Sequence, residues 1–509
     1  MRGVINTSLT THLMTKNDTV DIGIAGVLVL LGTILSMGGS FIIRIISARY
    51  LPTDEFGAVV LGISIVNLVS TSCLVGMNQG LVKYISEDIT DDLRNSYITY
   101  SLLIVSITGA IVSIFGTIFY EQVRIYLFDT TVDELLILSF VMSIPFFVQY
   151  KLISGILRGK MESQGFVLLT KIFWPGGRLL LTSLAVFIIG TGTSVALAYF
   201  CSASLAAMMG LYLIKKGGWA PTLSSDTDLM GLFSFSLPLL LSSSVFILLS
   251  YFDKILIGYY ISQVEVAKYE IAVTITALLG LFQTAFSFLL YPKVSELLST
   301  GRESEITTVY QQTTKWILVL TTPAFLVLIV SPDPLIAIFG DQYQIMEIAP
   351  LISTLAVGLY IDAVVGPNGE ALLGFGRSRV VLYYNLIAVG LNVGLNILLI
   401  PYVGILGAAI ASMIGYTIMN LLKSFDLYIR HSIPVVDKSS VVMAAASFLG
   451  GLAFSQVMTM SGSLLVEFGK SIILGGACLL IGLGTLITTG SVTQEDKELL
   501  TEIRSNLPI

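Results

Sequence analysis

The sequence has few of the residues that most enzymes use for acid–base and metal chemistry. Its 509 residues include two histidines, His12 and His431, and three cysteines, Cys73, Cys201 and Cys478. Both histidines fall in polar connecting regions, whereas the cysteines lie far apart inside apolar segments. An odd number of distant cysteines indicates neither a disulfide framework nor a metal cluster. We therefore expect no histidine-based catalysis and no metal centre.

Charge is also scarce. Charged residues make up 12% of the chain, about half of the roughly 25% found in soluble domains. Hydrophobic residues make up 55%, and the mean hydropathy is +0.88. Apolar runs recur along the whole chain, each long enough to cross a ~30 Å hydrocarbon core as a helix. The sequence therefore predicts an all-α polytopic membrane protein. The polar first twenty residues predict no cleaved signal peptide.

Charged or Gly/Pro-rich breaks divide the apolar runs into fourteen candidate spans. The first six cover residues 22–47, 57–80, 96–118, 135–157, 166–190 and 193–214. The next six cover residues 231–258, 266–291, 315–338, 347–373, 380–400 and 403–422. A final pair covers residues 440–460 and 469–489.

Basic residues are distributed unevenly between the two sides of these spans. If the N-terminus is cytoplasmic, twenty of the 27 Lys and Arg residues fall in the termini and connections on that side, Lys151 and Lys423 among them. Four fall on the opposite side, and Arg44, Arg178 and Lys254 lie inside spans. Because cytoplasmic loops carry an excess of Lys and Arg, we predict a multi-pass protein of the cytoplasmic membrane with both termini cytoplasmic.

The sequence contains an internal repeat, in which similar segments are separated by a nearly constant number of residues. The segment RIISARYLPTDEFG from Arg44 corresponds to DKILIGYYISQVEVAKY from Asp253, at an offset of 209. Three further pairs follow at offsets of 210, 210 and 215: KYISE with KVSEL, SVALAYFCSASLAAMMGLY with GILGAAIASMIGYTIMNLL, and GKMESQ with GFGRSR. An even number of spans per unit gives both copies one orientation. We therefore predict two parallel six-helix repeats with a cavity at their interface, an arrangement suited to alternating access.

The corresponding domains are an N-lobe of residues 1–218, a C-lobe of residues 219–430, and two additional transmembrane helices with a cytoplasmic tail in residues 431–509. The order of several segments then becomes recognisable: ARYLPTDEFG, DKILIGYYISQVEVAKY, YPKVSEL, IFGDQY, LLGFGRSR and NVGLNILLIPYVGILGAAIAS. In this order and spacing the chain resembles the multidrug/oligosaccharidyl-lipid/polysaccharide exporter (MOP) superfamily, and specifically its polysaccharide-type (Wzx-like) flippases.

The resemblance implies a flippase that moves polyprenyl-linked oligosaccharide from the cytoplasmic to the outer face of the membrane, for surface polysaccharide assembly or protein glycosylation. It also implies partners: the lipid-linked oligosaccharide, membrane lipids, and polysaccharide or glycan assembly enzymes, with no nucleic acid and a monomeric chain. In lipid II flippases the extra helices form a groove for the lipid tail. That role carries over to residues 440–489 by position alone.

Basic residues inside spans are the candidates for a head-group cavity. A basic side chain at the centre of a membrane helix costs about 2.5–3.5 kcal/mol, so it usually faces a cavity or a partner. Arg178 lies near mid-depth, directly after Trp174-Pro175-Gly176-Gly177, a pattern that favours a broken helix. Arg44 and Lys254 lie in the last turns of the first and seventh spans, with Arg49 just beyond. Snorkelling to the interface is the alternative interpretation for all four.

Polar side chains without charge could complete such a cavity. Gln283 in the eighth span could hydrogen-bond sugar hydroxyls, although polar residues also hold membrane helices together. Asn385, Asn392 and Asn396 share one face of the eleventh span, and we interpret this stripe as a helix-packing surface.

Three carboxylates are candidates for ion coupling or for an ion pair in the cavity. Asp362 lies near the middle of the tenth span, and Glu370 follows Pro367-Asn368-Gly369, a second broken-helix pattern. Asp253 adjoins Lys254, but neighbours in sequence do not face each other on a helix, so we expect its partner on another helix. No cofactor is expected apart from a coupling ion, H+ or Na+.

No enzyme motif is found in the sequence. It contains no nucleophile elbow and no phosphate-binding GxxxxGK[ST] loop, so we expect a transporter that is not driven by ATP. A multidrug or cation antiporter of the same superfamily and a lipid II flippase remain alternatives. A membrane-embedded transferase is disfavoured because the longest predicted outer connection, between the third and fourth spans, is too short to form an outer domain.

Overall fold

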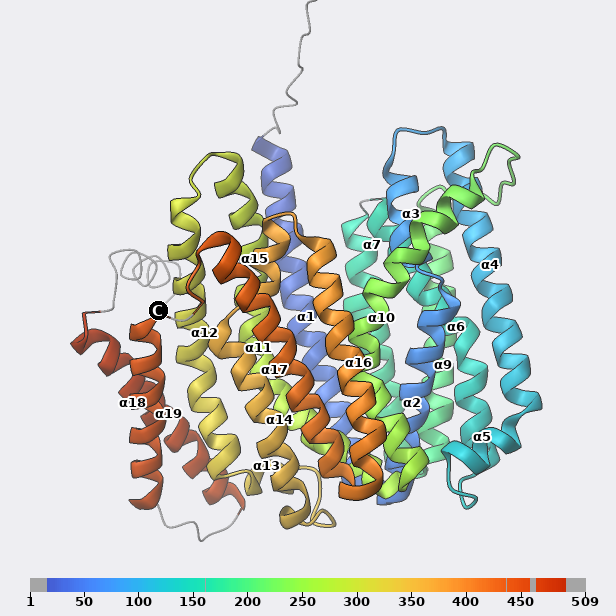
Figure 1. Ribbon diagram of the computed structural model, residues 1–509. Coiled ribbons are helices and arrows are strands. Elements are labelled where there is room, and N and C mark those ends of the chain that lie inside the picture. Colours follow the sequence, from blue (N-terminus) through green and yellow to red (C-terminus); the bar gives the residue numbers. More distant parts are fainter. Residues whose placement is uncertain (1–15, 161, 436, 458–463, 491–509) are drawn as a thin grey trace, which may run out of the picture.

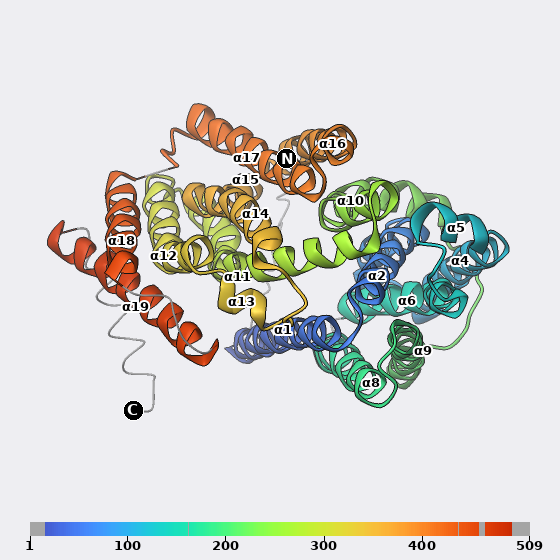
Figure 2. The ribbon, with the colours of Figure 1, turned by 90° about the horizontal axis from the view of Figure 1, so that it is seen from below.

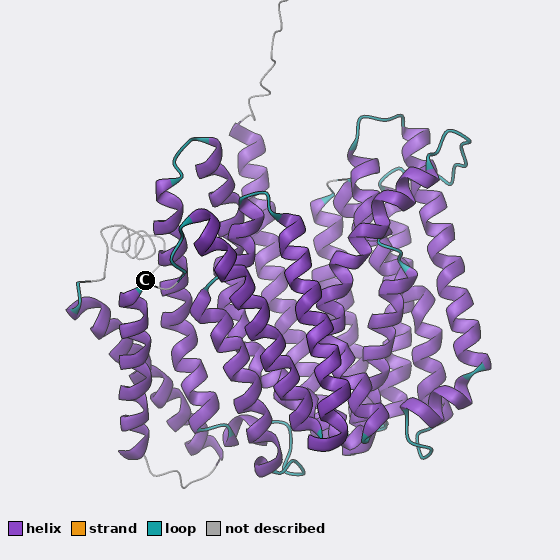
Figure 3. Ribbon diagram, viewed as in Figure 1, coloured by secondary structure: helices purple, strands orange, loops and turns teal. Residues whose placement is uncertain are grey.

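The computed structural model describes residues 16–160, 162–435, 437–457 and 464–490. His12 and the predicted cytoplasmic tail beyond residue 490 lie outside the described residues. The described chain forms a bundle of long helices running side by side (Figure 1; Figure 3).

The described part of the N-terminal half comprises nine α-helices and one π-helix. These are α1 (Lys16–Tyr50), α2 (Thr53–Cys73), α3 (Met77–Ser86), α4 (Asp91–Ile118), α5 (Tyr120–Leu127), α6 (Glu134–Gly159), α7 (Ser163–Val167), the π-helix η1 (Leu168–Phe173), α8 (Trp174–Ile188) and α9 (Gly192–Lys216).

The C-terminal half comprises α10 (Leu229–Tyr260), α11 (Gln263–Ser299), α12 (Ser304–Val330), α13 (Asp333–Ala337), α14 (Ile345–Val365), α15 (Asn368–Gly374), α16 (Ser378–Val403) and α17 (Ile405–His431). Two further helices follow, α18 (Lys438–Val457) and α19 (Leu464–Thr488). Five helices of the second half each begin a nearly constant number of residues after a helix of the first half. This offset is close to the one that separates the similar sequence segments. The pairs are α2 and α11, α4 and α12, α6 and α14, α7 and α16, and α9 and α17.

Within the described residues, eleven helices are long and apolar enough to cross a membrane. The helices α1, α10 and α11, with 35, 32 and 37 residues, cover the remaining three predicted spans. The prediction of an all-helical polytopic membrane protein is therefore confirmed. The assignment of several basic residues to connections was wrong, since the spanning segments contain Lys151 in α6, Lys171 in η1, Lys315 in α12 and Lys423 in α17.

The two predicted helix breaks have different outcomes. The fifth span stays helical through Trp174-Pro175-Gly176-Gly177, but a π-helical turn immediately precedes that sequence. A wider turn accommodates a proline ring that would otherwise clash with the preceding turn. The tenth span is interrupted as expected: α14 ends at Val365, and α15 begins at Asn368. Gly366 has a φ of +70° there, in the left-handed region that favours glycine.

The two halves meet along α2, which packs against both α10 and α11. Seen along the bundle, α4, α6, α8 and α9 gather on one side and α12, α14, α16 and α17 on the other, with α18 and α19 outside α12 (Figure 2). The approach of α2 to α11 is so close that a Cβ atom at Gly57 would overlap the carbonyl oxygen of Gln263. A glycine is therefore required at this contact between the halves.

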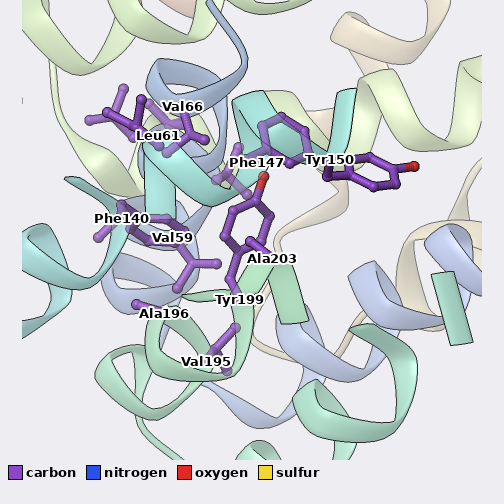
Figure 4. Close-up of a cluster of buried hydrophobic side chains, with 14 of the residues drawn as sticks. Val59, Leu61, Val66, Phe140, Phe147, Tyr150, Val195, Ala196, Tyr199 and Ala203 are labelled. Atoms are coloured by element: carbon purple, nitrogen blue, oxygen red, sulfur yellow. The ribbon is translucent and has the colours of Figure 1, made fainter. Parts of the chain in front are cut away.

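Inside the N-terminal half, α6 packs against α2 and α9 through a continuous apolar layer. Figure 4 shows Phe140, Phe147 and Tyr150 of α6 in one cluster with Tyr199 of α9 and Val59 of α2. Burying this layer fixes the rotation of α6 and α9 about their own axes. The aromatic residues that border the candidate site are therefore held in one place.

Candidate functional site

A cavity of about 230 Å³ lies between the two halves and is walled by α1, α2, α6, α8, α9, α10 and α11. Its polar lining comprises Ser40, Arg44, Ser47, Ser64, Asn67, Arg178, Thr182, Lys254 and Glu270. Its aromatic lining comprises Phe56, Phe147, Trp174, Tyr199 and Tyr251. The structure therefore brings together Arg44, Arg178 and Lys254, the three basic residues predicted from their positions inside spans.

Arg178 projects from α8 and lies against aromatic rings. Its guanidinium carbon is 5.3 Å from the ring centroid of Tyr199 and 5.7 Å from that of Trp174, distances at which cation–π attraction operates. The Nε atom is buried without a hydrogen-bond partner, and no carboxylate of the described chain forms an ion pair with this residue. Arg178 therefore presents an uncompensated positive charge to the cavity.

The aromatic wall behind Arg178 is itself well packed. Trp174 stacks on Tyr150 with centroids 5.0 Å apart and meets Tyr199 edge-on at 5.7 Å. Such contacts hold the rings in fixed orientations. Because Trp174 and Arg178 are four residues apart on one helix, the same packing also fixes the base of the arginine side chain.

The other two basic residues share one carboxylate. Glu270 of α11 lies 2.6 Å from Arg44 Nε and 2.5 Å from Lys254 Nζ. The side chains of Glu270 and Lys254 are 4% and 5% exposed, whereas that of Arg44 is 39% exposed. The three residues come from three different helices across the boundary between the halves. With Arg178 included, the cavity carries three positive charges and one negative charge.

Sequence reasoning missed Glu270, although a signal was present. Glu270 lies in the predicted eighth span at the same end as Lys254 in the seventh, and an acidic residue at that depth requires a cation nearby. It also missed the contribution of Tyr199 and Tyr251, because aromatic residues are common in membrane helices and carry no positional signal of their own.

Arg49 does not line the cavity. Its Nη1 donates to the carbonyl oxygens of Ala337 and Ile338 at 3.2 and 3.1 Å, which joins the end of α1 to α13. Beside it, Gln342 and Tyr343 donate to the carbonyl oxygen of Ala48 at 2.7 and 3.2 Å. Burial raises the pKa of Tyr343 to about 12, so its hydroxyl stays protonated and remains a donor. These contacts close the bundle at the end where α5 and α13 lie.

Gln283 also lies outside the cavity. Together with Asn420 it lies close to Asp362, in a second polar cluster within the C-terminal half. Lys423 interacts electrostatically with both Asp362 and Glu370. This cluster borders the break between α14 and α15. The cluster therefore contains two of the three candidate coupling carboxylates, Asp362 and Glu370. It also contains Lys423, which was predicted to lie in a connection.

Asp253 forms a third cluster, and its partners lie on other helices as expected. Its carboxylate accepts from Ser412 Oγ at 2.6 Å, from Tyr269 OH at 2.8 Å and from Asn396 Nδ2 at 2.8 Å. Asn392 adjoins it at 3.2 Å. The asparagine stripe of α16 thus contributes to helix packing by binding a buried carboxylate. Lys254 interacts with Asp253 electrostatically, but among the described residues its ion pair is with Glu270.

Two protein families match long segments of the chain. The polysaccharide biosynthesis protein family matches residues 25–298, more than half of the chain, and the MatE family matches residues 238–398. "Probable low-salt glycan biosynthesis flippase Agl15" of Haloferax volcanii is 24% identical over 414 residues, 80% of this chain and 84% of its own. "Probable flippase AglR" of the same organism is 26% identical over 388 residues, 75% of this chain and 78% of its own.

Solved structures share the fold at low sequence identity. The lipid II flippase MurJ in an inward closed conformation has a TM-score of 0.76 at 16% identity, covering 92% of this chain and all of its own. A multidrug resistance MATE transporter in an inward-facing conformation has a TM-score of 0.67 at 17% identity, covering 80% of this chain and 98% of its own. The chain thus belongs to the polysaccharide biosynthesis protein family, and it shares its fold with a lipid II flippase and with a MATE transporter of the MOP superfamily.

Proposed function

We propose that this protein is a flippase that moves a polyprenyl-linked oligosaccharide from the cytoplasmic to the outer face of the cytoplasmic membrane by alternating access. The observation that carries the proposal is Arg178, a guanidinium without a carboxylate partner in the cavity between the halves. The relatives named as probable flippases support it. A net positive cavity disfavours the alternative of a cation antiporter.

The cavity suits the head group of such a lipid. The phosphate that links a glycan to a polyprenol is anionic, and a guanidinium can bind it through two parallel hydrogen bonds. The side-chain oxygens of Ser40, Ser64 and Asn67 line the cavity and can accept from sugar hydroxyls, although Ser64 and Asn67 also donate to backbone carbonyls of α2. Because the cavity excludes bulk water on most sides, each of these interactions is stronger than it would be in solution.

Binding of the phosphate would also loosen the contact between the halves. Glu270 holds Arg44 of α1 and Lys254 of α10, so an incoming anion competes with it for both cations. Once Glu270 is displaced, the ion pair between α1 and α11 is lost. Opening also requires that the contacts of Arg49, Gln342 and Tyr343 break and that α2 separates from α11 beside Gly57. Bound substrate thereby stabilises the open state relative to the closed state. A ligand shifts such an equilibrium only when it binds the two states with different affinity.

A lipid tail would need an apolar path beside this cavity. A groove of about 380 Å³ lies between α11, α12, α13 and α19. Its lining is almost entirely apolar: Leu278, Phe282, Leu320, Pro323, Ala324, Val327, Leu328, Leu335, Phe468, Ser471, Ile472, Gly475, Gly476 and Leu479. The second of the two additional helices, α19, therefore contributes to a tail-binding surface, and membrane lipids would fill it in the absence of substrate.

The proposal includes the division of the chain into lobes and its orientation in the membrane. The N-lobe (1–218) and the C-lobe (219–430) are two parallel six-helix repeats, consistent with the nearly constant offset between the starts of corresponding helices, and residues 431–509 add two helices and a tail. Both termini are cytoplasmic, which places α5 and α13 at the outer face. Fourteen spans follow if α1, α10 and α11 each cross once. The flippase acts as a monomer and delivers its product to polysaccharide or glycan assembly enzymes.

Transport against a gradient needs an energy source, and Asp253 is our candidate for its coupling site. Its partners Ser412, Tyr269 and Asn396 are all neutral, so the carboxylate could take up H+ or Na+ without releasing a basic side chain. Asp362 is less suited to this role because Lys423 interacts with it, whereas Lys254, the lysine that interacts with Asp253, is already held by Glu270.

The test of the function measures the sidedness of lipid-linked oligosaccharide in inverted and right-side-out membrane vesicles. Cells depleted of the protein, or carrying Arg178→Ala, should accumulate the lipid on the cytoplasmic face. Arg379→Ala, which removes an exposed arginine at the start of α16, is the matched control and should behave as wild type. Unchanged sidedness on depletion would refute the proposal.

A further inference from the structure

Lys151 is a basic residue of the N-terminal half that the proposed cavity does not use. It lies on α6 one turn beyond Phe147, and its Nζ is 4.6 Å from the centroid of the Phe147 ring. Phe147 lines the cavity. Residues four apart share one face of a helix, so Lys151 lies on the cavity-facing side of α6.

The ammonium group of Lys151 has no counter-charge. No carboxylate in the described part of the chain forms an ion pair with it, and half-burial removes it from most of the solvent. The basic residues closer to the end of α6 have polar partners. Arg158 donates to the carbonyl oxygen of Asn78, and Lys160 donates to that of Gly217 and pairs with Glu162. An unpaired cation at membrane depth is costly, which points to a ligand that completes it.

The depth of Lys151 places it before Arg178 on a path from the cytoplasmic side. It precedes the end of α6 at Gly159 by eight residues, which is ~12 Å at 1.5 Å per residue. Arg44 and Lys254 each precede the opposite ends of their helices by six residues, or ~9 Å. Arg178 lies between these levels. Basic groups are thus present at three successive depths of the membrane.

A continuous aromatic surface joins the first two levels. Tyr150, the neighbour of Lys151, stacks on Trp174, and Phe147 contacts Trp174 at 5.2 Å. Arg178 lies over the same tryptophan. An anionic group leaving Lys151 therefore reaches Arg178 along one wall, without crossing a carboxylate.

We infer that Lys151 is the loading site for the phosphate or diphosphate ester of the lipid substrate, which it receives from the cytoplasmic side and passes to Arg178. The inference rests on the proposed function and adds a residue to it. Lysine suits a transient contact because its ammonium is a flexible point charge and does not form the bidentate fork of arginine. Loading at Lys151 displaces no ion pair, whereas binding at Arg44 and Lys254 must displace Glu270.

The test follows binding of geranylgeranyl diphosphate, a short prenyl diphosphate, to the full chain in lipid nanodiscs. Stopped-flow tryptophan fluorescence reports on Trp174 in a background in which the other two tryptophans, Trp219 and Trp316, are replaced by phenylalanine. In Lys151→Met the association rate constant should fall about tenfold while the dissociation rate constant stays within about twofold of wild type, because a steering charge acts on association. In Arg178→Ala the dissociation rate constant should rise at least about tenfold instead. Lys151→Arg should associate like wild type.

Lys216→Met, which removes an exposed lysine at the end of α9, is the matched control and should leave both rate constants unchanged. Lys151→Met should not lower the Tm, because methionine keeps the long stem and removes a desolvated charge. A lowered Tm together with lost binding would make Lys151 a structural residue and overturn the inference.

The two proposals fail differently. If Lys151→Met associates like wild type while Arg178→Ala loses binding, the loading site is wrong and the flippase function stands. If wild type does not bind the prenyl diphosphate at all, the proposed function itself fails.

Discussion

Arg44 and Glu270 form an ion pair across the boundary between the two halves, with Arg44 Nε 2.6 Å from Glu270 Oε1. The same carboxylate is 2.5 Å from Lys254 Nζ. Glu270 therefore neutralises part of the charge that a phosphate would otherwise meet, and it holds α1 to α11 while the site is empty. Glu270 therefore binds the two cations that would attract the substrate, and it also forms the contact that holds α1 against α11.

Glu270→Gln tests this relationship. Without the carboxylate, two cations lie close together without compensation, and losing one partner of a buried ion pair typically costs about 3–5 kcal/mol. The exposure of Arg44 places the expected loss at the lower end of that range. Thermal unfolding in detergent should show a lower Tm, and added geranylgeranyl diphosphate should restore it.

The same variant should bind the diphosphate about tenfold more tightly than wild type, or about 1.4 kcal/mol, because the internal competitor is gone. Glu347→Gln is the matched control, since Glu347 pairs with Lys268 outside the cavity. Unchanged affinity in Glu270→Gln would mean that the phosphate does not reach Arg44 and Lys254.

Arg49→Ala should weaken closure at the end of the bundle where α13 lies. It removes two hydrogen bonds to backbone carbonyls, worth together about 1 kcal/mol at an exposed site. A cysteine introduced at Ser47, which lines the cavity and is 2% exposed, should then react about fivefold faster with a membrane-impermeant thiol reagent added from outside. Labelling would use a background in which the three native cysteines are replaced.

Arg124→Ala provides the control for Arg49→Ala. Arg124 lies at the same end of the bundle, but its hydrogen bond is to Thr130 within its own half. Its loss should leave the labelling rate of the cysteine at position 47 unchanged. Equal acceleration by both variants would show a general loosening of that end, with no specific role for Arg49.

Much of the fold was predictable because its signal is local. The length of an apolar run reports whether a helix can cross a membrane, and Pro367 with its neighbouring glycines marked the interruption between α14 and α15. Arg178, Arg44 and Lys254 were found because a basic residue within a span is costly wherever it points. These inferences need no knowledge of how helices rotate or pack.

The remaining assignments depended on rotation and packing. Arg49 and Gln283 lie at suitable depths, but Arg49 points toward α13 and Gln283 toward Asp362. A rotation of about 100° per residue moves a side chain from a cavity to a neighbouring helix, and a sequence does not specify that angle. Glu270 was missed for the same reason, since its partners lie on two other helices, α1 and α10.

Asp253→Asn should abolish ion coupling while leaving head-group binding intact. Asparagine keeps the size of the side chain and can still accept one hydrogen bond, but it cannot carry the charge that H+ or Na+ would neutralise. In proteoliposomes with a fluorescent lipid-linked glycan, an imposed Na+ or pH gradient should accelerate wild type and not the variant. Asp362→Asn should still respond, because Asp362 has Lys423 as a neighbour. The reverse pattern would move the coupling site to the Asp362 cluster.

Gly476→Trp should block the tail groove without disturbing the head-group cavity. Gly476 lines the groove on α19, and a Cβ atom at that position meets no atom within 4 Å, so the larger side chain enters open space. Flipping of a lipid with a long polyprenyl tail should fall at least about tenfold, whereas binding of geranylgeranyl diphosphate should change less than about twofold, because a short tail needs little of the groove.

Gly484→Trp, on the same helix but outside the groove, also meets no atom within 4 Å and is the matched control. It should flip the long-tailed lipid like wild type. If both variants are equally impaired, α19 is sensitive to bulk in general. If neither is impaired, the tail lies elsewhere, and the two additional helices serve a purpose other than holding it.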